Sequence, residues 1–535
     1  MYANAADARR IALDNVGAAM TKMVRSSIHG GAQYATATLD LVHGICSRLG
    51  ACAADLKAQA IALSNARMRV AVLRTSTLQW CPEQNGMAAL RAPVCESSGF
   101  GRSLHVHVEY LRLTDHAESA RSQLHALAVQ CERSADVLAR AYGLYSEAEA
   151  KSRMATNRAL QWAARGAPAT MAKFTIAQAL GGWLYGVVTE GNFSAAHALN
   201  AISWQQEGLM RAASAAIGLH DGQSPVPSGA YAIGGISSRA TNLIQGDALT
   251  VESVDPHEPS VAPVSDMGGA LANLRRLSAA NADSTHGEYA TIAISRYVDA
   301  DGRRSWLVTI PGTDGNFDSP LGWEQNVELM SANAMQRRNA DSARMVVEAM
   351  RQAGIGRDER VALIGHSQGG IIAATLASDY ADEYRIEHIV TAGSPIANHP
   401  MGKGTWVTSI EMEDELGAAL DGEVNPRSEQ WLTIRGEVRN VADGSPADAN
   451  GAVDDGTAAM TAVDQSHQGK YELTHDLAYH TAAYENALSL GSEALANHDS
   501  HFMATIHGDY METTYWSGRM EHGKHDIEMD DTHTQ

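Results

Sequence analysis

Two kinds of hydrophobic pattern divide this chain. In residues 1–165, apolar side chains recur three, four and seven positions apart, which places them on one face of an α-helix. One such stripe runs from Leu13 to Met23, through Val16 and Met20, and a second runs from Leu124 to Tyr145. The pattern predicts an all-α domain over residues 1–165, built of long helices packed as hairpins.

From about residue 266, short apolar runs alternate with amphipathic segments. Val361–Ile364 is wholly apolar, as is typical of a central parallel strand that is covered on both faces. A helical stripe over Ala343–Met350 precedes it, and another helix is expected from Ile371. This alternation predicts an α/β domain over residues 266–500, with a mostly parallel sheet flanked by helices.

The segments around this domain have a different character. Residues 166–265 combine apolar helical stretches with a linker rich in Gly, Ser and Pro, and Phe174–Thr189 is the most apolar window. That window is too short to span a bilayer, so we expect it to pack between domains or to contact a membrane surface peripherally. Residues 501–535 are acidic and rich in histidine, and we expect them to form a frayed tail.

The amino-acid composition limits the class of protein to which this chain can belong. The 535 residues are 44% hydrophobic and 19% charged, which indicates several folded domains and not a disordered chain. Lys and Arg number 41 against 62 Asp and Glu, a net charge of −21 that argues against a nucleic-acid partner. The N-terminus lacks the continuous apolar core of a cleavable signal peptide. We therefore expect a protein that is not transmembrane and that is either cytoplasmic or exported without such a peptide.

One motif carries chemistry. Gly365-His366-Ser367-Gln368-Gly369 follows the apolar strand and opens the next helix, which is the context of a nucleophile elbow. The sharp turn that exposes the serine requires small residues two positions before and after it, here Gly365 and Gly369. The N–H groups at the start of the helix then face developing negative charge. The motif predicts Ser367 as a nucleophile.

The sequence GHSQGG after a VALI strand resembles the lipases and esterases of the α/β-hydrolase fold, over roughly residues 266–500. The resemblance implies that Trp306–Asp314 is the strand and loop that precede the elbow, with the backbone N–H groups of Thr313 and Gln368 as the oxyanion hole. It also implies a catalytic triad in the order Ser, acid, His, which needs neither cofactor nor metal.

The resemblance leaves the acid and the histidine less well determined. The acid should follow the strand Thr405–Ile410; Asp is the commoner triad acid, so Asp414 is preferred and Glu415 is the alternative. His475 is preferred as the base because it opens a helix shortly before a tyrosine, and His480 is the alternative.

These parts predict a serine hydrolase that cleaves carboxylic esters, with lipid or acyl esters as substrates, through an acyl-enzyme on Ser367. The alternative is an interaction protein, non-catalytic or associated with secretion, that uses a degenerate hydrolase fold.

Residues 1–165 show a looser resemblance to the WxG-type hairpins of type VII secretion. Trp80 lies in a break between two helices, and Tyr145 and Glu149 match a Y-x-x-x-[DE] spacing. The resemblance implies contact with a secretion machinery or a helical partner through residues 1–165. Trp80 is followed by Cys-Pro and not by x-Gly, so a plain amphipathic hairpin is the alternative.

Overall fold

The computed structural model of the chain describes residues 20–32, 36–79, 110–144, 226–228, 230–231, 245–256, 260–282, 289–314, 316, 318–413, 415, 420, 423–442, 460–468 and 474–522. It divides into two compact units. One unit consists of residues 35–139 with 455–458, and the other comprises the rest of the chain.

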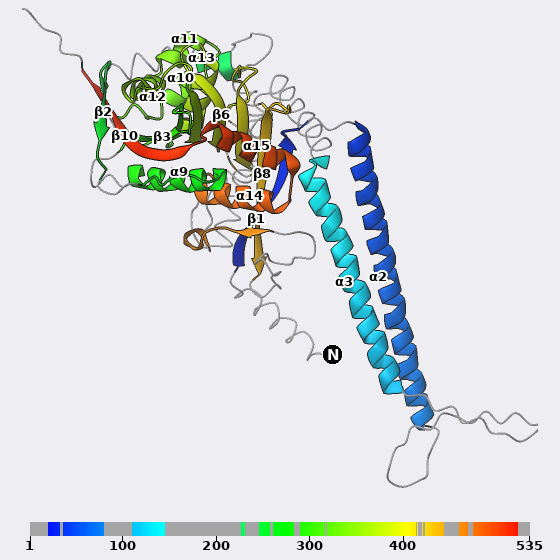
Figure 1. Cartoon of the computed structure of the whole chain (residues 1–535). Helices are drawn as coiled ribbons and strands as arrows, with labels where there is room; N and C mark the ends of the chain where they lie inside the picture. Colours follow the sequence, from blue (N-terminus) through cyan, green and yellow to red (C-terminus); the bar gives the residue numbers. More distant parts are fainter. Residues whose placement is uncertain are drawn as a thin grey trace, which may run out of the picture. The chain divides into compact units, whose positions relative to one another are not determined.

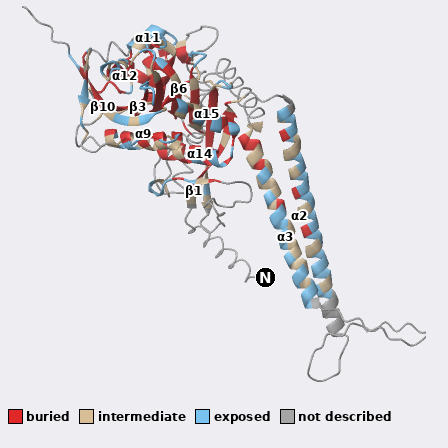
Figure 2. Ribbon diagram, in the orientation of Figure 1, coloured by how far each residue is buried: buried red, intermediate tan, exposed pale blue. Residues whose placement is uncertain are grey.

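The smaller unit contains two long helices, α2 (Thr36–Gln79) and α3 (Tyr110–Ala141) (Figure 1). Lys57 Nζ lies 2.7 Å from Glu132 Oε1, and Arg67 pairs with Glu118, so the two helices run antiparallel. Small side chains such as Ala53 and Ala128 are buried, whereas most other residues of the pair are exposed or half-buried (Figure 2). The predicted N-terminal helical region is confirmed. Trp80, Tyr145 and Glu149 lie outside the described residues, so the resemblance to type VII hairpins stays a prediction.

The first 165 residues are nevertheless not all helical. Met20–Gly30 is a strand, β1, that pairs antiparallel along its whole length with β8 (Trp431–Ala442). Val24, Ser26 and Ile28 are buried at alternate positions, as a strand requires. The predicted helical face through Met20 and Met23 is therefore wrong, because pairing with a strand far along the chain overrides the local apolar spacing.

The larger unit is built on one ten-stranded sheet of order β2-β10-β3-β4-β5-β6-β7-β8-β1-β9. Its centre, β4 to β8, is parallel, and the strands on both sides of this centre are antiparallel. The remaining strands are β2 (Ala248–Val254), β3 (Thr291–Val298), β4 (Arg304–Ile310), β5 (Arg360–His366), β6 (Arg385–Ala392), β7 (Trp406–Met412), β9 (Thr461–Ala462) and β10 (Asp509–Glu521).

Helices cover both faces of this sheet (Figure 1). On one face lie α10 (Gln325–Leu329), α11 (Ala334–Asn339), α12 (Asp341–Gln352) and α13 (Gln368–Asp379). On the other lie α9 (Met267–Ala282), α14 (Leu477–Ser489) and α15 (Glu493–Thr505), with the short 3₁₀ turn η5 (Gln465–His467) before α14. The predicted α/β class is confirmed.

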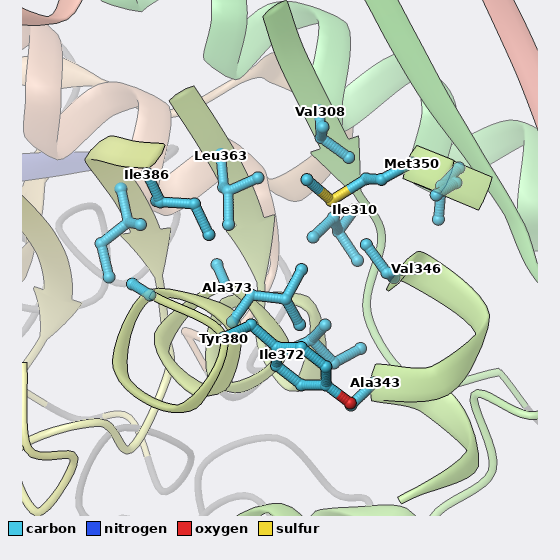
Figure 3. Close-up of a cluster of buried hydrophobic side chains, with 14 of the residues drawn as sticks. Val308, Ile310, Ala343, Val346, Met350, Leu363, Ile372, Ala373, Tyr380 and Ile386 are labelled. Atoms are coloured by element: carbon cyan, nitrogen blue, oxygen red, sulfur yellow. The ribbon is translucent and has the colours of Figure 1, made fainter. Parts of the chain in front are cut away.

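The main core lies between the parallel strands and the α12–α13 layer. Figure 3 shows Val308, Leu363 and Ile372 among the apolar side chains that meet there, all fully buried. Because β5 and α13 are both held in this core, the turn that joins them is held at both ends.

The predicted limits of the catalytic domain, 266–500, also need correction. β2 precedes that range, and β10 lies in the predicted acidic tail, where it pairs with both β2 and β3. Tyr515 and Trp516 of β10 are buried, so this part of the tail belongs to the sheet. Phe174–Thr189 lies outside the described residues. Among the helices that the structure describes, none is both long enough and apolar enough to cross a membrane.

Candidate active site

Ser367 occupies the turn between β5 and α13. Its backbone has φ 53° and ψ −120°, a conformation that residues other than glycine rarely adopt. Its N–H donates to Ala392 O at 2.8 Å. The turn thus presents the Ser367 hydroxyl at the carboxyl edge of the parallel strands.

Steric overlap with the backbone requires glycine at positions 365 and 369 of the motif. A Cβ on Gly365 would overlap the backbone of Gly369, and a Cβ on Gly369 would overlap Ile310 O at the end of β4. The strand, the turn and the helix therefore approach one another more closely than any side chain allows.

His475 lies directly before α14, and its Nε2 is 2.9 Å from Ser367 Oγ. Asp476, the N-cap of α14, accepts from Ala478 N at 2.8 Å, which holds the start of the helix. The structure thus brings together two residues that stand 108 positions apart in the sequence.

Glu415, which follows β7, accepts a hydrogen bond from His475 Nδ1. Its side chain is fully buried, and Met412 N donates to its Oε2 at 3.1 Å. The carboxylate at this position is therefore that of the alternative acid. Asp414, the preferred residue, lies outside the described residues.

His480 contacts the same carboxylate from the other side. Its Nε2 is 3.0 Å from Glu415 Oε2, and its Nδ1 is 3.0 Å from Asp476 O. Both ring nitrogens of His480 are thus occupied by partners other than Ser367. His475 has the position next to the hydroxyl that was predicted for a base, and His480 does not.

The charges of this cluster are set by burial and by its own members. Burial alone raises the pKa of the Glu415 carboxyl, but the charge of His480 and the hydrogen bonds from both histidines outweigh it and hold that pKa well below its ordinary value. Burial, together with nearby His475 and His480, lowers the pKa of His366 to about 3. His366 is therefore neutral, and its Nε2–H donates to His475 O at 2.9 Å.

His366 and Gly393 were not singled out from the sequence. The rings of His366 and His475 lie 4.8 Å apart, so His366 supports the histidine through its ring as well as its hydrogen bond. Gly393 has φ 63°, and a Cβ there would overlap Glu415 Oε1. The place of His366 inside the motif was the available signal; for Gly393 there was none, since it stands 22 positions before the acid that it touches.

The two residues implied for an oxyanion hole lie on either side of the elbow. Gln368 begins α13, where a backbone N–H has no acceptor within the helix, and its side chain donates to Gly322 O at 2.7 Å. Thr313 follows β4, and its Oγ1 accepts from Asn326 Nδ2 at 3.2 Å.

Asp314 organises the loop that carries Thr313. Its carboxylate accepts from Ala290 N at 3.1 Å, from Ser319 Oγ at 2.7 Å and from Asn316 N at 2.9 Å. Sequence reasoning gave Asp314 no role of its own. These three bonds tie the loop to segments before and after it.

A cavity of about 650 Å³ opens onto Ser367 and His475. Its wall combines apolar residues, such as Ala282 and Pro311, with the polar Asn281 and Asn316. Trp323 also lines it and is 69% exposed. A carbonyl group in this cavity can therefore reach the Ser367 hydroxyl, with both apolar and polar surface for the rest of a substrate.

Within the described part of the chain, no group of three or more His, Cys, Asp or Glu side chains is arranged to hold a metal ion. Ser367, His475, His480, His366 and Glu415 are the polar side chains that the structure gathers at the elbow.

Comparison with protein families gives one match. Residues 326–442 match the PGAP1-like alpha/beta domain, a hydrolase-like fold related to lipases and esterases. The predicted α/β-hydrolase-like fold, preceded by a helical region, is confirmed. Comparisons with curated proteins and with solved structures find no match. The matched segment contains Ser367 and Glu415 but ends before His475, and Thr313 precedes it, so the match does not extend to those two residues.

Proposed function

We propose that this protein is a serine hydrolase that cleaves carboxylic esters through an acyl-enzyme on Ser367. The observation that carries the proposal is the continuous chain of contacts from Glu415 through His475 to the Ser367 hydroxyl. The strained elbow backbone and the cavity that opens onto the same hydroxyl support it. The similarity of residues 326–442 to a hydrolase-like domain agrees with this chemistry.

The reaction begins with proton transfer. His475 Nε2 takes the proton of Ser367 Oγ while that oxygen attacks the ester carbonyl, and the Glu415 carboxylate orients the imidazole and stabilises its positive charge. The N–H groups of Gln368 and Thr313 stabilise the oxyanion. His475 then protonates the departing alcohol, and a water molecule, activated by the same histidine, releases the acid.

The cavity limits the substrate class. Its volume of about 650 Å³ lies within the range of sites for small organic ligands. Its mixed wall suits an ester with an apolar acyl part and a polar group. Lipid and acyl esters are therefore the first substrates to test, with p-nitrophenyl esters of increasing chain length followed by phospholipids.

Ser367→Ala tests the proposal. The variant should lose ester hydrolysis and labelling by a fluorophosphonate while its thermal unfolding stays close to that of the wild type, because the change removes one oxygen on a turn. Ser378→Ala, on the same helix, is the matched control and should keep both activities. Ester hydrolysis by Ser367→Ala at the wild-type rate would overturn the assignment.

The second candidate is an interaction protein on a hydrolase fold that has lost activity. The departure of the sequence after the acid, Gly417-Ala418 in place of the Val-Pro of related hydrolases, is the observation that favours it. Absence of fluorophosphonate labelling of the folded wild-type chain would support this candidate and contradict the first.

A further inference from the structure

The contacts of His480 are unusual for a buried histidine. It is fully buried on α14, and Asp476 O and Glu415 Oε2 each lie 3.0 Å from one of its ring nitrogens. A carbonyl oxygen only accepts hydrogen bonds, and an ionised carboxylate does the same. Both nitrogens of His480 therefore donate, and a histidine that donates from both nitrogens is an imidazolium cation.

From this geometry, and resting on the proposed function, we infer that His480 is a positioning residue: as a buried cation it holds Glu415 ionised and oriented towards His475. Glu415 thus lies between two histidines, one on each carboxylate oxygen. The catalytic base uses Oε1, and His480 occupies Oε2 together with Met412 N.

The electrostatic reason is the cost of burial. An isolated carboxylate with no exposed surface is strongly destabilised, and an opposite charge in contact with it offsets much of that cost. The reverse also holds for His480. Burial alone disfavours its charged form, but the Glu415 carboxylate outweighs burial and raises the pKa of His480 above its ordinary value.

Among the residues that the structure describes, the charged or titratable groups that face His480 belong to the site. Glu415 follows β7, His475 and Asp476 precede α14, and His366 ends β5. The ring of His480 lies 6.3 Å from that of His475 and 5.9 Å from that of His366. His366 is neutral, so the charge of His480 acts chiefly on Glu415.

This arrangement has a consequence for the pH range of activity. As pH rises through the raised pKa of His480, the cation loses its proton, Glu415 loses its counter-charge, and activity should fall. His480 therefore contributes to the alkaline limb of the pH profile.

His480→Gln tests the inference, because glutamine can still donate to Glu415 but carries no charge. We expect kcat for a p-nitrophenyl ester to fall about 10- to 100-fold with KM nearly unchanged. The alkaline limb of kcat/KM should disappear, because glutamine has no proton to lose in that pH range. His480→Ala should lose more activity, and His480→Gln should recover part of it.

His498→Gln is the matched control. His498 is as deeply buried as His480, and both of its ring nitrogens have a partner. These partners are Thr408 Oγ1 and Glu429 O, each 3.0 Å away. In the described structure no carboxylate contacts His498. Its loss should lower stability without moving the pH profile. A profile of His480→Gln that coincides with that of the wild type would overturn the inference.

A spectroscopic measurement separates this inference from the proposed function. In ¹⁵N-histidine-labelled wild-type protein at neutral pH, one imidazole signal that is absent from His480→Gln should show both nitrogens protonated. A neutral His480 signal would refute the inference even if Ser367 is the nucleophile. If Ser367→Ala kept ester hydrolysis, the proposed function would fail while the charge of His480 would still be read from the spectrum.

Discussion

At the scale of the residue, the backbone of Gly393 shows how closely the site is built. Position 393 directly follows β6 and has φ 63°, and the space where a Cβ would lie is taken by the Glu415 carboxylate. His480 Nε2 is 3.0 Å from the same point. Glycine is thus required both for the backbone conformation and for the approach of the acid.

Gly393→Ala should therefore lower both stability and activity. The left-handed backbone costs a non-glycine residue about 1–2 kcal/mol, and the added methyl group would displace Glu415 from His475. Gly491→Ala is the matched control, since Gly491 has φ 64° but no atom within 4 Å of a Cβ. Thermal unfolding should show a loss for both variants and ester hydrolysis a loss for Gly393→Ala alone; equal activities would contradict the close approach.

The choice between the two adjacent acids is also a prediction at this scale. Glu415→Gln should lower kcat by about 10⁴-fold, because the amide no longer holds His475 in the required tautomer. Asp414→Asn should change kcat only slightly. If Asp414→Asn, and not Glu415→Gln, showed the large loss of kcat in a p-nitrophenyl ester assay, Asp414 would be the acid.

At the scale of the element, a buried ion pair joins α11 to α13. Arg337 and Asp379 are each about 5% exposed, and two bonds of 2.7 Å connect them, from Nε to Oδ2 and from Nη2 to Oδ1. Arg337 Nη1 also donates to Ser331 O at 2.7 Å. The pair secures the far end of the helix whose first turn follows Ser367.

Asp379→Asn should destabilise the protein by about 3–5 kcal/mol, because it leaves a buried guanidinium without its counter-charge. Glu348→Gln is the control, since its partner Arg351 is 67% exposed and an exposed pair contributes less than about 1 kcal/mol. Urea-induced unfolding followed by tryptophan fluorescence would compare them. A similar midpoint for both variants would show that burial of the pair carries no special cost.

At the scale of the whole molecule, buried neutral histidines make stability depend on pH. Burial lowers the pKa of His399 to about 4, and likewise that of His498, from an ordinary value near 6.5. The unfolded chain therefore binds more protons than the folded one between these values. Their stability contribution is complete above pH 6.5 and is lost as pH falls towards 4.

We expect the free energy of unfolding to fall between pH 7 and pH 4, by on the order of 3 kcal/mol for each of these histidines. Urea titrations at several pH values would measure the slope. His399→Gln should flatten it, because one proton-binding group disappears from the unfolded state. An unchanged slope in that variant would mean that His399 is already protonated in the folded protein.

The α/β class and the elbow could be predicted because both depend on residues that are neighbours in the sequence. Val361–Ile364 is apolar on both faces, and the glycines beside Ser367 satisfy close contacts within one turn. β1 and β10 were missed because their pairing partners lie far away in the chain, as Ser26 with Gly436 and Tyr515 with Ala293. The local spacing of apolar residues does not indicate which distant strand will pair with a segment.

The sequence by itself determined where the elbow serine would stand and which kind of domain would carry it, because strand, turn and helix follow one another directly in the chain. Only the tertiary structure decided which carboxylate meets His475, and that a second histidine shares it. Glu415 and His475 stand 60 positions apart, and His475 and Ser367 stand 108 apart. Glu415 faces the base because its carboxylate lies against Gly393, which follows β6, and against His480 of α14, and neither contact can be read from the residues next to it in the sequence.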